Sequence, residues 1–284
     1  MIREAVAGDE PALEAYLAKN FATTMFMRGN LRDFGLGNTV DMYAMRYFIA
    51  LKNGVITAVC AVANFGTIMA QAEGSFEKLA EFARAQLSES FVCMGLLGTP
   101  EQVAQLKKTF VTQGVTPIYD KAEPLFSMDL EYLVIPDFID HELRKAEQKD
   151  MPLLAKWAYD YTIEVGLRPA GDASRAEAVE EAKSRINTER FKLLIVNKQP
   201  VAQVLFNATM PDCVQIGAVF TPPEFRCKGY GRLVVAQHLA QARENGAQKA
   251  VLFSASENAS RAYRAIGFQQ IGTYVITLFN IEKD

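Results

Sequence analysis

Apolar residues in the second half of the chain predict a short strand, then two helices, then three strands, and finally helices and strands in alternation. Asp150 and Asp172 stand where two helices are expected to begin, because short acidic side chains can cap free amide groups. Helices return between strands only near the end, so we expect an α/β domain with a mixed sheet and helices on both faces. The predicted strands are 141–146, 191–196, 201–208, 214–220, 250–254, 268–271 and 273–278, and further helices are predicted over 232–247 and about 258–266.

The first half repeats this order of elements. Asn53 and Gly54, between two apolar runs, predict a two-residue hairpin. Thr99 and Gln102 have the spacing of a capping box, in which each residue satisfies a free amide group of the other. The remaining predicted elements of this half are a strand over 2–6, a helix that starts at Asp9, a helix over 75–87 and a strand over 91–97.

The length of 284 residues is sufficient for two domains of ordinary size. Pro136 and a cluster of acidic residues interrupt the pattern between 134 and 140, which marks a join. We therefore predict tandem α/β domains at 1–134 and 137–284, of which the first is a degenerate copy of the second.

Composition excludes several classes of function. The formal net charge of −3 argues against a nucleic-acid binder, because neutralising phosphates requires a basic face. No apolar run is long enough to span a membrane and the start lacks the apolar segment of a signal peptide, so we expect a cytoplasmic protein with no membrane partner. The four cysteines show no CxxC spacing and there are two histidines, so no clustered metal site is expected.

One segment of the second half predicts a binding site. A strand over 214–220 ends at two prolines, and a basic loop with Gly229 and Gly231 then opens a helix. The first amide groups of a helix lack intrahelical partners, and glycines let them approach a phosphate closely. Arg226, Lys228 and Arg232 add positive charge at the same point. A diphosphate is the ligand that this arrangement favours, although a plain tight turn would have the same glycines.

The corresponding place in the first half lacks these features. The segment 71–75, after the apolar run there, has a single glycine, no basic residue and the acidic Glu73. A carboxylate at a helix start repels a phosphate. The first half is therefore not expected to bind the same ligand.

The loop and a later segment resemble the GNAT superfamily of acetyl-CoA-dependent N-acyltransferases. Residues 226–231 match the family signature (Gln/Arg)-x-x-Gly-x-(Gly/Ala), and residues 263–268 match its Tyr-x-x-x-Gly-Phe segment. The whole chain further resembles tandem bacterial acetyltransferases with a divergent N-terminal half, most clearly over 219–226. The resemblance covers most of 137–284 well and 1–130 weakly.

The resemblance implies roles for particular residues. The main chain of Val219, Phe220 and Thr221 is expected to pair with the pantetheine arm of acetyl-CoA, and an asparagine such as Asn258 often contacts the cofactor, although its spacing from Tyr263 is shorter than usual. The expected diphosphate-binding loop comprises Arg226, Cys227, Lys228, Gly229, Tyr230, Gly231 and Arg232.

Two residues are candidates for catalysis. The family's tyrosine at the position of Tyr263 protonates the departing thiolate of CoA; packing against the sheet is the alternative reading. Glu164, on the helix of the only tryptophan, could bind or deprotonate an amine. The favoured reading of this helix is an amphipathic one with Trp157 in the core and the acids solvated. No carboxylate lies in the strand 214–220, so the general base is not identified.

We expect direct transfer of an acetyl group from acetyl-CoA to a primary amine, in a small molecule or a peptide. A non-catalytic acyl-CoA-binding module is the alternative, since it would keep the glycine loop without needing Tyr263. A nucleotide-binding protein fits less well, because the chain has no Gly-Lys-Ser/Thr loop and no Gly-x-Gly-x-x-Gly followed by an acid. The acceptor amine and the oligomeric state stay open.

Overall fold

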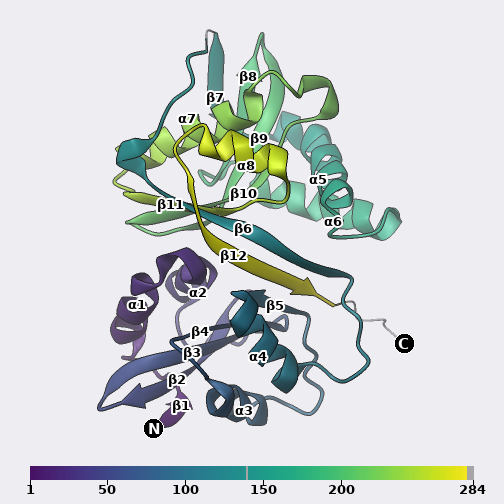
Figure 1. Ribbon diagram of the computed structural model, residues 1–284. Helices are drawn as coiled ribbons and strands as arrows, with labels where there is room; N and C mark the ends of the chain where they lie inside the picture. Colours follow the sequence, from purple (N-terminus) through teal and green to yellow (C-terminus); the bar gives the residue numbers. More distant parts are fainter. Residues whose placement is uncertain (139, 280–284) are drawn as a thin grey trace. The chain divides into compact units, whose positions relative to one another are not determined.

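The computed structural model describes residues 1–138 and 140–279. Residues 139 and 280–284, which belong to the predicted second domain, lie outside the described part. The chain forms two units, Met1–Glu123 with Thr273–Asp284 and Pro124–Gly272 (Figure 1).

These units differ from the predicted contiguous domains 1–134 and 137–284. The reason is that two strands, β6 (Tyr119–Asp129) and β12 (Gln269–Leu278), each begin in one unit and end in the other. Neither strand is recognisable as a shared element from local sequence, because its partners are distant along the chain. The predicted pair of strands 268–271 and 273–278 is wrong, since β12 runs continuously through Gly272.

The second unit carries a mixed sheet in the order β6-β11-β10-β9-β8-β7. Neighbours are antiparallel except β10 and β11, which are parallel. After the end of β6 its elements are η1 (Leu130–Tyr132), β7 (His141–Lys145), η2 (Gln148–Asp150), α5 (Met151–Val165), α6 (Asp172–Arg185), β8 (Phe191–Val196), β9 (Gln199–Thr209), β10 (Cys213–Phe220), η3 (Pro223–Phe225), α7 (Tyr230–Glu244), β11 (Lys249–Phe253) and α8 (Glu257–Arg264).

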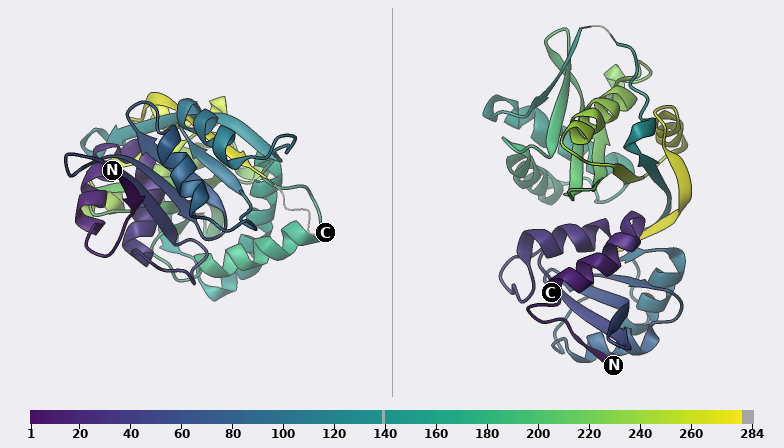
Figure 2. Two further views of the ribbon diagram at one scale, coloured as in Figure 1. Left: turned by 90° about the horizontal axis from the view of Figure 1, so that it is seen from below. Right: turned by 90° about the vertical axis from the view of Figure 1, so that its left-hand side faces the viewer.

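Apolar side chains cover both faces of this sheet. Residues of α7, such as Leu233 and Leu239, pack with Phe206 and Ile216 on one face. Trp157 of α5 packs with residues of α6 and β8 on the other face. Figure 2 shows α7 and the α5–α6 pair on either side of the strands of this unit. The predicted α/β class, with a mixed sheet between helices, is confirmed.

The first unit repeats this arrangement with β1 to β5 and the C-terminal part of β12. β4 and β5 are its parallel pair, and α3 and α4 pack on one face of the sheet. The strand predicted at 91–97 starts later, at Gly95. The elements are β1 (Ile2–Glu4), α1 (Glu10–Lys19), α2 (Phe21–Phe34), β2 (Met45–Lys52), β3 (Val55–Ala63), β4 (Thr67–Ala72), α3 (Glu77–Ala85), β5 (Gly95–Gly98) and α4 (Pro100–Phe110).

A repeated ion pair links β1 to the residue before α1, and β7 to the residue before α5. Arg3 binds Asp9 through two hydrogen bonds of 2.5 and 2.8 Å, and Arg144 binds Asp150 in the same way at 2.6 and 2.9 Å. Each carboxylate also accepts, at 2.8 Å, the backbone amide three residues earlier. Asp9 and Asp150 therefore fix the turn before the helix. The prediction that Asp150 caps its helix is wrong, because its carboxylate binds the Glu147 amide and Arg144 instead. Asp172 is the first residue of α6 and makes no cap either.

Candidate functional site

The site is built where β10 and β11 separate. Their parallel pairing runs from Cys213 and Lys249 to Ile216 and Leu252, but β10 continues to Phe220. The pairing of β10 with β9 also shifts register between Gly217 and Phe220. A strand that loses its neighbour and bulges in this way leaves backbone groups available for a ligand that lies along it.

The bulge is held by a buried side chain of the neighbouring strand. Ala218 has a φ of +46°, which is uncommon for a residue with a side chain. The side-chain amide of Gln203 on β9 donates to the Ala218 carbonyl at 3.2 Å, and Gln203 is fully buried. Position 217 has no room for a side chain, because a Cβ on Gly217 would lie 2.2 Å from Asn207 Nδ2.

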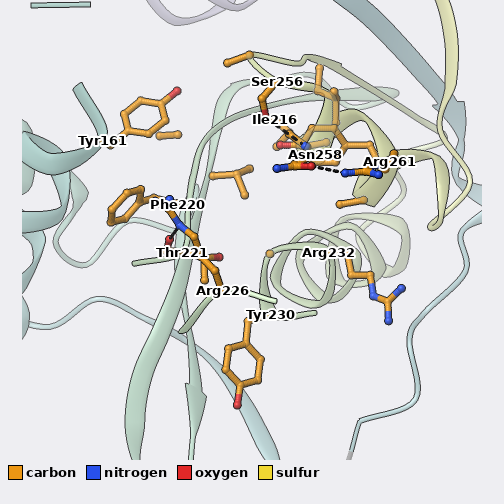
Figure 3. A pocket seen from close by; sticks show the side chains of 18 of the residues that line it. Tyr161, Ile216, Phe220, Thr221, Arg226, Tyr230, Arg232, Ser256, Asn258 and Arg261 are labelled. Atoms are coloured by element: carbon orange, nitrogen blue, oxygen red, sulfur yellow. Dashed lines mark hydrogen bonds between the residues drawn. The ribbon is translucent and has the colours of Figure 1, made fainter. Parts of the chain in front are cut away.

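A cavity of about 710 Å³ opens between the separated strands. Its walls come from β10, the loop to α7, the end of β11, α8 and the last turn of α5. Figure 3 shows Tyr161 and Phe220 on one side of the pocket, and Asn258 and Arg261 on the opposite side. All of these residues belong to the second unit.

The first turn of α7 forms one end of this cavity. Gly229 precedes the helix with a φ of +80°, and no side chain caps the amide groups that follow. A Cβ on Gly231 would lie 3.3 Å from Thr221 Oγ1, so a side chain there would fill the space in front of these amides. Uncapped amides at the positive end of a helix dipole bind anions. The first turn also contains no acidic residue.

The three predicted cations of the loop do not act together. Arg226 donates to Glu164 at 2.5 Å and to the Thr221 carbonyl at 2.9 Å. Lys228 lies 5.7 Å from the centre of the Phe225 ring and is not part of the cavity wall. Arg232 lines the cavity, with its Nε 3.3 Å from where a Cβ of Gly229 would be. We call the uncapped amide groups in the first turn of α7 the amide cluster. Of the three side chains, Arg232 is the one that lies beside it.

Tyr263 lines the cavity from α8 and is largely buried. Serine side chains fix the start of this helix: Ser256 accepts from the Ala259 amide at 3.2 Å, and Ser260 donates to Ser254 at 2.9 Å. The Tyr263 ring meets the Phe268 ring edge to face at 6.1 Å. The tyrosine is therefore held rigidly on the wall that faces β10.

The structure brings the predicted site residues together, with one exception. Lys228 lies outside the cavity wall, and Glu164 lines it while bound to Arg226. Sequence reasoning missed Arg261, which lines the cavity and donates to the Asn258 side chain. The three-residue spacing of Asn258 and Arg261 on a helix was the available signal. The predicted residues that line the cavity are Val219, Phe220, Thr221, Arg226, Cys227, Gly229, Tyr230, Gly231, Arg232, Asn258, Tyr263 and Glu164.

The corresponding place in the first unit is filled by its own side chains. β4 extends past its last pair with β5, as β10 does with β11, but Gln71 Oε1 there accepts from Thr23 at 2.8 Å and from Gln102 at 3.4 Å. At the start of α3, Gln105 accepts the Phe76 amide at 3.1 Å. Glu77 adds a negative charge to the first turn of α3. Both features oppose a bound anion.

Residues 152–268 match the model of the Acetyltransferase (GNAT) family. The second unit carries a GNAT-family domain. This family consists of acyltransferases that use acetyl-CoA, so the match supports acyl transfer in general. No curated protein sequence matches the chain.

Solved structures are similar to the whole chain. A Drosophila protein has a TM-score of 0.67 at 14% identity, with 98% of each chain covered. A GCN5-related N-acetyltransferase from Kribbella flavida has a TM-score of 0.57 at 18% identity, covering 93% of this chain and 96% of its own. A tandem GNAT protein from the clavulanic acid biosynthesis pathway has a TM-score of 0.55 at 14% identity, covering 98% and 97%. At these identities the similarity establishes the fold, which is a tandem GNAT fold.

The helices of the described residues offer no membrane span. None of them combines the length and the apolar character that crossing a bilayer requires.

Proposed function

We propose that the second unit transfers an acetyl group from acetyl-CoA to a primary amine, directly and without an acyl-enzyme intermediate. The observation that carries this proposal is the cavity between β10 and β11, which ends at the uncapped first turn of α7. The GNAT-family match supports the reaction class. The acceptor is a small molecule or a peptide that presents an amine.

The residues present fit acetyl-CoA. Amide groups at the start of α7, with Arg232 beside them, suit the diphosphate. The bulged backbone of Val219 to Thr221 suits the pantetheine arm, which pairs as a short peptide strand would. The glycine at 231 leaves the space in front of the amides open. When bound, acetyl-CoA supplies the thioester whose acetyl group is transferred.

Residues of the chain then have defined tasks. Backbone amides at the β10 bulge polarise the carbonyl oxygen, and Gln203 keeps that bulge in place by binding the Ala218 carbonyl. Tyr263 holds a proton at its phenolic oxygen for the leaving sulfur. Glu164 is bound by Arg226, so we do not assign it the task of deprotonating the amine. Water reaching the open cavity serves that purpose in our proposal.

We propose a structural role for the first unit. Its equivalent cleft is occupied by Gln71, and the start of its α3 is occupied by Gln105 and carries Glu77. The bound Phe76 amide and the charge of Glu77 both disfavour a diphosphate there. One cofactor per chain is the consequence.

The first test measures CoA thiol released from acetyl-CoA with a panel of amines. We expect release to depend on an amine, and Tyr263→Phe to lower turnover about a hundredfold while the Kd for CoA stays within about twofold. Tyr159→Phe is the control, because Tyr159 lies on α5 beneath Arg175 and outside the cavity wall. If the protein bound acetyl-CoA but released no CoA thiol with any amine of the panel, a non-catalytic acyl-CoA-binding module would be favoured.

A further inference from the structure

Arg261 is a cation of the cavity wall that the proposed transfer does not use. It lies on α8, is solvent-exposed and lines the side of the cavity formed by that helix. Its Nη2 donates to Asn258 Oδ1, one helical turn earlier. Figure 3 shows this bond at the end of the pocket away from Tyr161. The guanidinium group is thus oriented by Asn258, and most of its donors are left for a ligand.

The other cations near the cavity have different positions. Arg226 is bound to Glu164 and to the Thr221 carbonyl, and Arg232 lies beside Gly229 at the amide cluster. The Lys228 ammonium lies near the Phe225 ring, outside the wall. Arg261 is therefore a positive charge set apart from the diphosphate-binding loop, on a different helix.

CoA carries a third phosphate group that needs a partner. Besides the diphosphate, it has a phosphomonoester on the 3′ position of its ribose, and such a group bears about −1.5 to −2 charges at neutral pH. The planar fork of an arginine binds phosphate through paired hydrogen bonds. A separate cation at the rim of the cavity is what recognition of this group requires.

We propose that Arg261, oriented by Asn258, binds the 3′-phosphate of CoA and makes the site selective for CoA over 3′-dephospho-CoA. The inference rests on the proposed function, since it takes CoA as the ligand. Arg261 is the binding residue and Asn258 is a positioning residue. The amide cluster of α7 and Arg232 remain the diphosphate site.

The test is a calorimetric comparison of CoA with 3′-dephospho-CoA on the full chain. We expect the unaltered protein to bind CoA about tenfold more tightly. Arg261→Gln should weaken CoA binding by about that factor, leave dephospho-CoA binding unchanged, and so remove the preference. Arg261→Lys should keep part of it, and Asn258→Ala should reduce it less than Arg261→Gln does.

Arg264→Gln is the matched control. Arg264 lies on the same helix, binds Glu257 at 3.0 Å and Gln270 at 3.1 Å, and is not part of the cavity wall. Its replacement should preserve the preference for CoA. Circular dichroism verifies that each variant is folded.

Three results would overturn the inference. Equal affinity of the unaltered protein for the two ligands would mean that the 3′-phosphate is not recognised. Equal weakening of both ligands by Arg261→Gln would place Arg261 at the diphosphate. A full preference for CoA in Arg261→Gln would assign recognition to another residue. Failure of the unaltered protein to bind either ligand is a different result, and it would reject the proposed function itself.

Discussion

Single side chains decide whether the amide groups at a helix start are available to a phosphate. In the second unit Gly231 leaves the first amides of α7 open, whereas in the first unit Gln105 accepts the amide of Phe76 before α3. A single side-chain oxygen therefore takes the place that a phosphate oxygen would need. The charge of a side chain depends on its partners in the same way. Arg226 is paired with the Glu164 carboxylate, so it attracts an anionic ligand less strongly than an unpaired arginine would.

At the same scale, His238 gives the second unit a pH-dependent stability. Its ring stacks on Phe206 at 3.7 Å, its Nε2 contacts the Arg190 carbonyl at 3.2 Å, and its Nδ1 is buried without a partner. Burial is the main reason that its pKa is lowered to about 4 from the model-peptide value of 6.5. The folded protein thus contains a neutral histidine, which the unfolded chain protonates more readily.

The sign of the effect follows from that difference. Below about pH 6.5 the His238 ring binds a proton in the unfolded chain but stays neutral in the folded one. The free energy of unfolding therefore falls as the pH is lowered from about 6.5 to about 4. We expect a loss of about 3 kcal/mol over this range from His238 alone. Urea unfolding between pH 7 and 4.5 measures it. His238→Gln can keep a donor for Arg190 without titrating, and an equally steep decline in that variant would contradict the assignment.

At the scale of elements, sequence patterns correctly predicted the turns and helix ends that are formed by residues close together in the chain. The Asn53-Gly54 hairpin has positive φ at both residues, 53° and 80°, and the Thr99 capping box is present with both of its bonds. The order of strands and helices in the second half also follows the sequence pattern. These features depend on neighbours within a few residues, which is the range over which a sequence pattern carries information.

Other elements depend on distant partners and were missed. β6 contains Pro124 and four charged residues, so its strand character comes from pairing with β11, more than a hundred residues later. The contact of Arg226 with Glu164 joins residues 62 apart. In the same way, the sequence located the glycine loop but could not show that Arg226 faces α5 and that Arg261 lines the cavity.

The bulge in β10 supports a prediction at this scale. Replacing Gln203 by Leu removes the bond that holds the Ala218 carbonyl, so the amides that polarise the substrate should lose their alignment. We expect turnover in the thiol-release assay to fall about tenfold, with the Kd for CoA changed less than about threefold.

Gln215→Leu is the matched control for Gln203→Leu. Gln215 is equally buried, lies on β10 itself, and its side-chain amide has no partner in the described part of the chain. Its replacement should leave turnover unchanged. If both variants, or neither, lost activity, the role of Gln203 in holding the bulge would have to be abandoned.

At the scale of the whole molecule, the two units share an arrangement of elements, and the cavity described above lies in the second unit. Both units have the same paired arginine and aspartate before their first long helix, and both have one parallel strand pair that separates at its end. The tandem GNAT fold is thus visible in the strands as well as in the comparisons. In the features that a diphosphate needs, the two units differ at the cleft and at the start of one helix.

The central claim is that the start of α7 in the second unit, and no other part of the described chain, binds the diphosphate of CoA. A calorimetric titration of the full chain with CoA tests it most directly. We predict one CoA per chain, and at least about tenfold weaker binding in Gly231→Val, because the added methyl groups fill the space before the amides. Gly171→Val, at the open start of α6, should bind normally. Two CoA molecules per chain, no binding, or unchanged affinity in Gly231→Val would contradict the account.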